Sequence, residues 1–127
     1  MLAEFKDYLK TLGLGADYYY IGKIENIKEK VIGVYSVGNF ERVEAVGRKS
    51  SYDIAELQLL VHWNRNARES EEASRAVYEA LRYIQNVDMG DIHVDFLDLE
   101  YGEPIFVGTD ENNVYEYHIQ LRIYYRR

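Results

Sequence analysis

The chain has 127 residues, a formal net charge of −7 at pH 7 and no cysteine. Its length suits one domain, which we expect to span residues 1–127. We expect no membrane partner, because no apolar run reaches the roughly 18 residues of a membrane span. The missing cysteines exclude disulfides, thiolate metal sites and cysteine nucleophiles, and the acidic balance argues against specific nucleic-acid binding, which needs clustered Lys and Arg.

The first part of the chain predicts a short helix and then a β-hairpin. Apolar residues recur at helical spacing up to Gly13. They are Leu2, Phe5, Leu9 and Leu12. Residues 18–24 and 31–37 are rich in β-branched and aromatic types around a polar stretch, which indicates two strands joined as a hairpin.

Residues 38–51 are the least periodic segment, and we interpret them as a long, mobile connection. Loops of this length are functional or disordered when they carry no secondary structure. This segment mixes an aromatic residue with both charge signs, a composition that can become ordered against a partner. The interface candidates are therefore Phe40, Arg42, Glu44, Arg48 and Lys49. An ordinary solvated loop is the alternative.

In the middle of the chain, the spacing of apolar residues changes from every second residue to a helical period of 3.6 residues. One apolar face of a strand is predicted first, followed by an amphipathic helix that continues to Gln85. The apolar strand face consists of Ala55, Leu57, Leu59, Val61 and Trp63. His62 falls on the other, polar face and is expected at the surface. Asn66 and Glu69 have the spacing of a capping box, in which the Asn66 side chain accepts an amide hydrogen and Glu69 reaches back.

The last part of the chain predicts three more strands. Residues 92–99 alternate with a slip near Phe96 that suggests a bulge, and residues 104–108 begin with a proline typical of an edge strand. Residues 110–113 form a turn before a final strand with one apolar face. The order α-β-β-β-α-β-β-β predicts an α+β fold, mainly an antiparallel sheet with two helices packed on one side.

The residue types offer little catalytic chemistry. His62, His93 and His118 lack the paired spacing of a zinc site and are interpreted as solvated or structural. The Gly13–Gly15 pair follows a helix instead of a strand, which is wrong for a dinucleotide fingerprint, and no nucleophile motif is present. We therefore expect no enzyme, with no catalytic, cofactor-binding or metal-binding residues.

A group of carboxylates leaves one enzymatic alternative open. Six acidic residues crowd one region, namely Asp88, Asp91, Asp95, Asp98, Glu100 and Glu103. Charged residues along a surface strand are the ordinary explanation. The alternative is a small ligand-binding or hydrolytic α+β domain that uses these carboxylates in a deep pocket.

Several segments, in order, resemble one known family. The first is the run from Leu59 to Asn66 with Glu69, Glu71, Glu72, Ala73 and Tyr78-Glu79-Ala80-Leu81. The others are Tyr20-Ile21-Gly22-Lys23-Ile24 with Ile32-Gly33-Val34-Tyr35, and Gly108-Thr109-Asp110-Glu111-Asn112 with Tyr115-Glu116-Tyr117 and Ile123-Tyr124-Tyr125. Together they are similar to the tail terminator or minor capsid proteins of long-tailed bacteriophages or prophages. The departure is Asn113, where glycine is expected, but Asn tolerates the left-handed conformation.

The resemblance implies a structural virion protein made in the host cytoplasm. Such a protein forms a homo-oligomeric ring, expected to be a hexamer, at the head-proximal end of the tail tube. There it ends tube polymerisation and joins tail to head, with the major tail-tube protein and a head-completion protein as partners. DNA would pass through the lumen without specific binding, and the 13 tyrosines suit ring contacts. A head-completion (connector) protein of the same junction is the close alternative.

Overall fold

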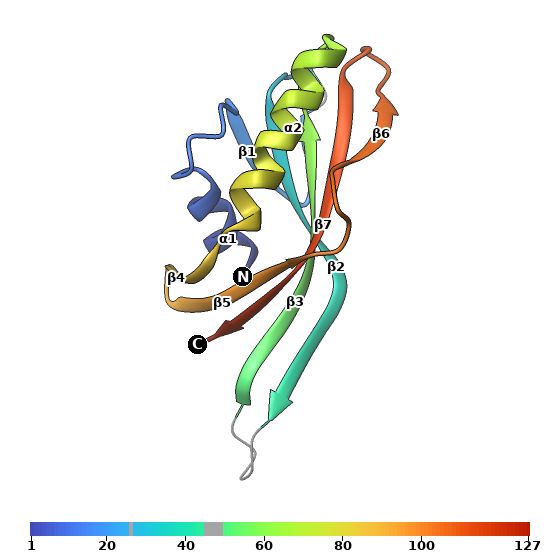
Figure 1. The fold of residues 1–127 in the computed structure, drawn as a ribbon. Helices are drawn as coiled ribbons and strands as arrows, with labels where there is room; N and C mark the ends of the chain where they lie inside the picture. Colours follow the sequence, from blue (N-terminus) through green and yellow to red (C-terminus); the bar gives the residue numbers. More distant parts are fainter. Residues whose placement is uncertain (26, 45–49) are drawn as a thin grey trace.

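The structure, a computed structural model, describes residues 1–25, 27–44 and 50–127, without the side chains of residues 38–44, 50 and 51. Within these ranges the chain forms two helices and seven strands (Figure 1). In chain order they are α1 (Leu2–Leu9), β1 (Tyr18–Ile21), β2 (Val31–Glu44), β3 (Ser50–His62), α2 (Ala67–Arg82), β4 (Gln85–Met89), β5 (Ile92–Leu99), β6 (Ile105–Thr109) and β7 (Tyr115–Arg126). Neither of the helices described is both long and apolar enough to cross a membrane.

All the described strands join one sheet, in the order β1-β2-β3-β7-β5-β4, with β6 also paired to β7. The long strand β7 pairs with β3 along one edge and with β5 and β6 along the other. Both helices cover one face of the sheet (Figure 1). The predicted α+β class, with a mainly antiparallel sheet, is confirmed, and the structure adds the short strand β4 to the expected order.

The predicted hairpin of the first two strands is wrong, because β1 and β2 run parallel. Tyr18 lies opposite Val31, and Ile21 lies opposite Val34. Gly22, with φ of +76°, ends β1, and the chain then returns before β2 begins. The polar stretch that resembles a hairpin turn is long enough to span this return, since nine extended residues cover about 30 Å. The Asp17 amide donates to the carbonyl of Lys30 (2.8 Å) and holds the two strand starts together.

The core lies between the helices and one face of the sheet. The predicted apolar face of β3 is buried as expected, from Ala55 to Trp63. The facing residues of β7, also buried, are Ile119, Leu121, Ile123 and Tyr125. Helix α1 contributes Phe5 and Leu9, and α2 contributes Val77 and Leu81. This packing fixes the position of both ends of the sheet.

Helix α2 begins at Asn66, as predicted, but only half of the capping box forms. The Glu69 amide donates to the Asn66 side-chain oxygen (3.0 Å). The Glu69 carboxylate instead accepts a hydrogen bond from Asn64 Nδ2 (2.9 Å), and the Asn66 amide donates to Asn64 Oδ1 (2.9 Å). The second half of the prediction is wrong because Asn64, at the end of β3, lies closer to both groups.

Candidate partner interface

The predicted interface residues fall on a hairpin that the sequence had suggested as a loop. Residues 38–44 belong to β2, and residues 50 and 51 belong to β3. The backbone of Phe40 lies opposite Ala55, that of Arg42 opposite Asp53, and that of Glu44 opposite Ser50. Arg48 and Lys49 lie outside the described residues. The interpretation as a long loop is therefore wrong for the strand residues.

A bulge explains why the strand was missed. The register advances by four residues in β2 between Ser36 and Phe40, but only by two in β3 between Leu57 and Ala55. Gly38 and Asn39 fall in this bulge, and both residue types are rare in regular strands. The pairing of β2 with β3 continues past β7, whose pairing with β3 starts at Asp53, so this end of the two strands extends beyond the rest of the sheet (Figure 1).

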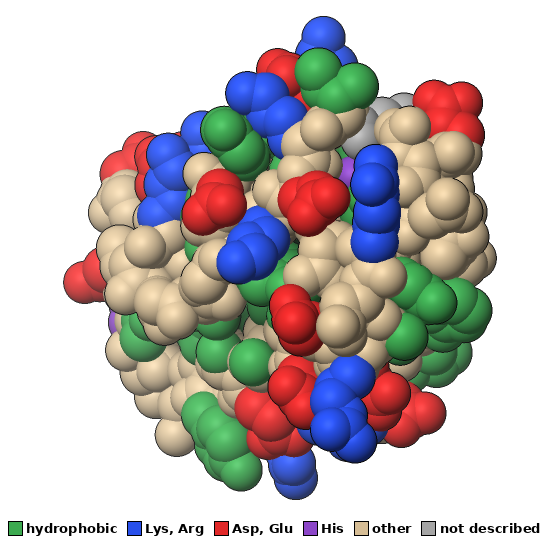
Figure 2. Space-filling model, turned by 90° about the horizontal axis from the view of Figure 1, so that it is seen from above, with side chains coloured by type: hydrophobic (Ala, Val, Ile, Leu, Met, Phe, Trp, Pro, Cys, Tyr) green, Lys and Arg blue, Asp and Glu red, His purple; other side chains and the backbone are tan. Residues whose placement is uncertain are grey.

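A second candidate surface is the edge strand β6. Phe106 and Val107 expose 54% and 52% of their surface. The Phe106 ring lies 5.3 Å from the ring of Tyr117 and 6.1 Å from that of Tyr115. Figure 2 shows hydrophobic side chains gathered on the right, which is the side of β6 in Figure 1. Exposed apolar residues on an edge strand are a ready contact for another chain.

A groove lies beside this edge, between α2 and β6. It has a volume of about 210 Å³ and is lined by Glu71, Ser74, Arg75, Glu103, Pro104, Phe106 and Tyr117. Burial raises the pKa of Tyr117 above its ordinary value, with a smaller contribution from the charge of Glu71. The groove thus joins an aromatic floor to a charged rim, the usual arrangement of a protein contact.

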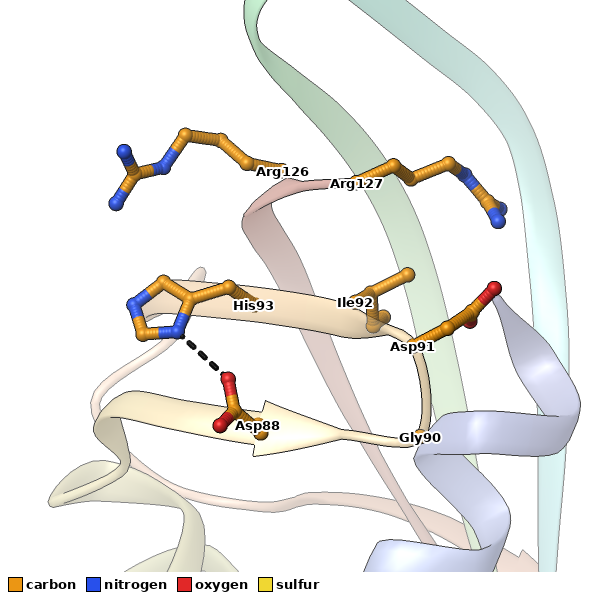
Figure 3. Close-up of a pocket in the computed structure, with 7 residues that line it drawn as sticks. All are labelled: Asp88, Gly90, Asp91, Ile92, His93, Arg126 and Arg127. Carbon is orange, nitrogen blue, oxygen red and sulfur yellow. Dashed lines mark hydrogen bonds and ion pairs between the residues drawn. The ribbon is translucent and has the colours of Figure 1, made fainter.

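A wide hollow lies at the turn between β4 and β5 (Figure 3). Its volume is about 470 Å³, it is wide open to solvent, and it is lined by Asp88, Gly90, Asp91, Ile92, His93, Arg126 and Arg127. His93 points toward Asp88, with Nδ1 2.9 Å from Oδ1. The Arg126 and Arg127 side chains extend away from each other in Figure 3. An open, charged hollow of this kind does not enclose a small substrate.

The six carboxylates of the enzymatic alternative are not brought together into one pocket. Asp88 and Asp91 line the hollow described above, whereas Asp98 and Glu100 line another beside Arg122. Glu103 lies in the groove next to β6. Asp95 is paired with Arg126 through a 2.7 Å contact. The deep shared pocket that this alternative requires is therefore not formed by these residues.

His62 is buried, and the expectation that it lies at the surface is wrong. Its side chain is fully enclosed on the sheet face opposite the helices. His62 Nδ1 lies 2.8 Å from Glu116 Oε2 across the β3–β7 pair, and Nε2 lies 3.7 Å from Asp110 Oδ2. Strand alternation places His62 on this face, but it does not reveal whether that face is covered. The other two histidines behave more as expected: His93 is partly exposed, and His118 contacts Gln58 (3.1 Å).

A solved structure shares this fold. A chain in the solved structure entitled "Virion of native gene transfer agent (GTA) particle" matches with a TM-score of 0.61 and 12% identity, over 92% of this chain and 83% of that chain. At this identity the likeness shows the shared fold. No curated protein sequence matches.

The family is shown by a second comparison. The family model described as "Bacteriophage tail terminator protein" matches residues 8–127. The chain therefore belongs to the bacteriophage tail terminator family, and the resemblance seen in the sequence is confirmed. Membership identifies a structural protein of the phage tail.

Proposed function

We propose that this protein forms a ring at the head-proximal end of the tail tube, stops tube polymerisation and joins the tail to the head. The observation that carries the proposal is the family match over residues 8–127, which covers α2 and the whole sheet but only the last two residues of α1. We propose a single tail-terminator domain, a homo-oligomeric ring expected to be a hexamer, and a place at the head–tail junction of the virion.

The described residues offer two unlike surfaces for assembly, and we propose one of them for the contacts within the ring. A closed cyclic assembly uses heterologous contacts, so each subunit must present two different and complementary surfaces. The β6 edge with Phe106 and the adjacent groove provide an apolar surface. The β2–β3 hairpin projects at the other end of the sheet (Figure 1). We propose that β6 contributes to contacts between subunits.

The hairpin is proposed to contact the partners of the ring. Its residues Phe40, Arg42, Glu44, Arg48 and Lys49 combine an aromatic ring with both charge signs. A projecting strand pair can pair with a tube subunit, because its backbone groups extend beyond β7. The partners proposed are the major tail-tube protein on one side and a head-completion protein on the other.

The charge of the chain fits a lumen through which DNA passes. The net charge is −7, and the basic residues lack the clustering that phosphate binding requires. A negatively charged surface repels the DNA backbone, so DNA passes without being held. We propose a structural role without catalysis, and this agrees with the dispersed carboxylates of the β4–β6 region.

The experiment that tests the function is capping of tail tubes. Tubes assembled from the major tail-tube protein encoded with this chain are mixed with purified protein and imaged by negative-stain electron microscopy. We expect a ring at one end of each tube and an arrest of growth when the protein is present. Tubes that grow to the same length distribution without a ring would refute the proposal. Binding to a portal-side protein but not to tubes would instead identify the head-completion alternative.

A further inference from the structure

A histidine and two carboxylates meet at the end of the sheet where β3, β7 and the β6–β7 turn come together. His62 lies on β3, Glu116 lies opposite it on β7, and Asp110 lies in the turn. The side chains of His62, Asp110 and Glu116 expose 0%, 11% and 17% of their surface. One ligand atom from each lies within 4.8 Å of the others.

The hydrogen bonds of the cluster leave one nitrogen of His62 free. In the neutral imidazole with the proton on Nδ1, this nitrogen donates to Glu116 Oε2 at 2.8 Å. The lone pair then lies on Nε2, which is buried and has no hydrogen-bond partner among the described residues. Buried polar atoms without partners are rare, because each lowers the stability of the folded state.

Asp110 presents the second such atom to the same point. Its Oδ1 accepts the backbone amides of Asn112 (2.8 Å) and Val114 (3.0 Å), which holds the turn. Its Oδ2 is buried and has no hydrogen-bond partner in the described part of the chain. The two atoms without partners, His62 Nε2 and Asp110 Oδ2, therefore face each other across 3.7 Å.

This distance fits two ligands of one metal ion better than a hydrogen bond. An N–H···O bond spans about 2.7–3.2 Å, so 3.7 Å leaves both atoms unsatisfied. A zinc ion about 2.0–2.1 Å from each atom would be bound at an angle of roughly 124–135°, wider than the ideal tetrahedral angle. Glu116, bonded to the other imidazole nitrogen, then takes the place of the carboxylate that orients a metal-binding histidine.

A second histidine, His93, also lies near two carboxylates, but it lacks the buried, unpartnered atoms that a metal site would use. His93 Nδ1 lies 2.9 Å from Asp88 Oδ1, and its Nε2 lies 3.7 Å from Asp95 Oδ1. That Asp95 oxygen already accepts Arg126 at 2.7 Å, and the His93 side chain is 37% exposed. The distances are similar, but the guanidinium of Arg126 already binds the Asp95 oxygen, and the imidazole of His93 is open to solvent. His93 is therefore a matched control.

We propose that the protein binds one Zn²⁺ ion through His62 Nε2 and Asp110 Oδ2, with Glu116 positioning the imidazole. Two water molecules would complete a tetrahedral coordination, and the partly exposed side chains of Asp110 and Glu116 form the side of the cluster nearest to solvent. Imidazole nitrogen with carboxylate oxygen suits zinc and its neighbours in the first row more than calcium. The ion would tie the β6–β7 turn to the end of β3, a staple independent of the proposed ring contacts.

The test is metal binding by the purified protein, stripped with EDTA and desalted. Isothermal titration with ZnCl2 is expected to show one site per chain, and ZnCl2 is expected to raise the melting temperature progressively with its concentration. CaCl2 at the same concentrations is expected to leave the melting temperature unchanged. Absence of zinc binding would overturn the proposal. Tighter binding of calcium than of zinc would overturn the assignment of the metal class.

Three variants and one control locate the site. Asp110→Asn keeps an oxygen for the two turn amides but loses the charged ligand, so the folded variant is expected to lose zinc binding. His62→Gln is expected to do the same, and Glu116→Gln is expected to weaken binding about 10- to 100-fold. His93→Gln is expected to bind zinc as the parent does. Zinc binding that survives Asp110→Asn, or that disappears in His93→Gln, would overturn the assignment of these residues.

Discussion

The junction between β3 and α2 depends on Asn64, and removal of its side chain tests how these two elements are held together. The side chain is almost fully buried. Its Nδ2 donates to Glu69 Oε1 (2.9 Å), while its Oδ1 accepts the Asn66 amide (2.9 Å) and the Ser70 hydroxyl (3.0 Å). Asn64→Ala removes all three hydrogen bonds at once.

The expected loss of stability depends on whether each hydrogen-bond partner of Asn64 can bind water once the side chain is removed. Glu69 and the Asn66 amide lie at exposed positions and turn to water, so each lost bond costs about 0.5–1.5 kcal/mol. The Ser70 hydroxyl is buried and keeps only a longer contact, 3.3 Å, to the Asn64 carbonyl. We expect Asn64→Ala to lower the free energy of unfolding by roughly 2–4 kcal/mol. Asn66→Ala removes a single capping bond and is expected to cost about 1 kcal/mol.

Urea unfolding, followed by the fluorescence of Trp63 and by far-UV circular dichroism, measures these differences. Trp63 is the one tryptophan of the chain and adjoins Asn64, so the two signals together test whether unfolding is cooperative. Asn64→Asp serves as a control that keeps the acceptor oxygen and loses the donor. If Asn66→Ala destabilises the protein as much as Asn64→Ala, the cap formed by Asn66 is enough to hold the junction, and the reasoning from Asn64 is refuted.

Three further predictions concern the core, the hairpin and alkaline pH. Trp63→Ala removes a buried ring and is expected to lower the free energy of unfolding by about 3–5 kcal/mol in urea unfolding followed by circular dichroism. Arg42→Glu with Arg48→Glu is expected to weaken tube capping seen by electron microscopy while melting stays unchanged. Burial, chiefly, raises the pKa of Tyr35 and Tyr117 above the ordinary 10.0. The unfolded chain therefore loses these protons first, so their contribution to stability is complete below about pH 10 and falls as the pH rises further. Urea unfolding at a series of pH values measures this fall.

Each of these predictions has a control and a contrary result. An unchanged urea midpoint for Trp63→Ala would contradict the burial of its ring. Arg68→Glu with Arg82→Glu makes the same charge change on the exposed face of α2, and equal loss of capping in both double variants would show a general charge effect. Tyr35→Phe should flatten the alkaline fall in stability, and an unaltered fall would exclude Tyr35 as a cause.

The parts of the fold that could be predicted are those in which one face of an element is buried. Alternation from Ala55 to Trp63 identifies a strand and its core face, because one face must be apolar along the whole of β3. The turn at residues 110–113 is equally local, and Asn113 adopts the left-handed conformation expected of it, with φ of 64°. These features depend on neighbouring residues alone.

The features of the fold that the sequence did not predict depend on contacts between distant segments. A strand pattern shows which side chains share a face but does not give strand direction, so β1 was paired with β2 in the wrong sense. The bulge at Gly38 and Asn39 interrupts the pattern of β2 and conceals its second half. Burial of His62 depends on cover over the second face of the sheet, and its carboxylate partners lie 48 and 54 residues further along the chain.

The central place of β7 has a consequence for the order in which the protein folds. This strand carries the pairing partners of β3, β5 and β6, and the contact between His62 and Glu116 closes a loop of more than fifty residues. Until residues 115–126 leave the ribosome, β3 has one open edge and β5 and β6 lack their main neighbour. Pairings so distant in sequence form slowly and expose strand edges before they form. Only a chain synthesised through β7 can cover those edges, because β7 supplies the pairing partners of all three strands.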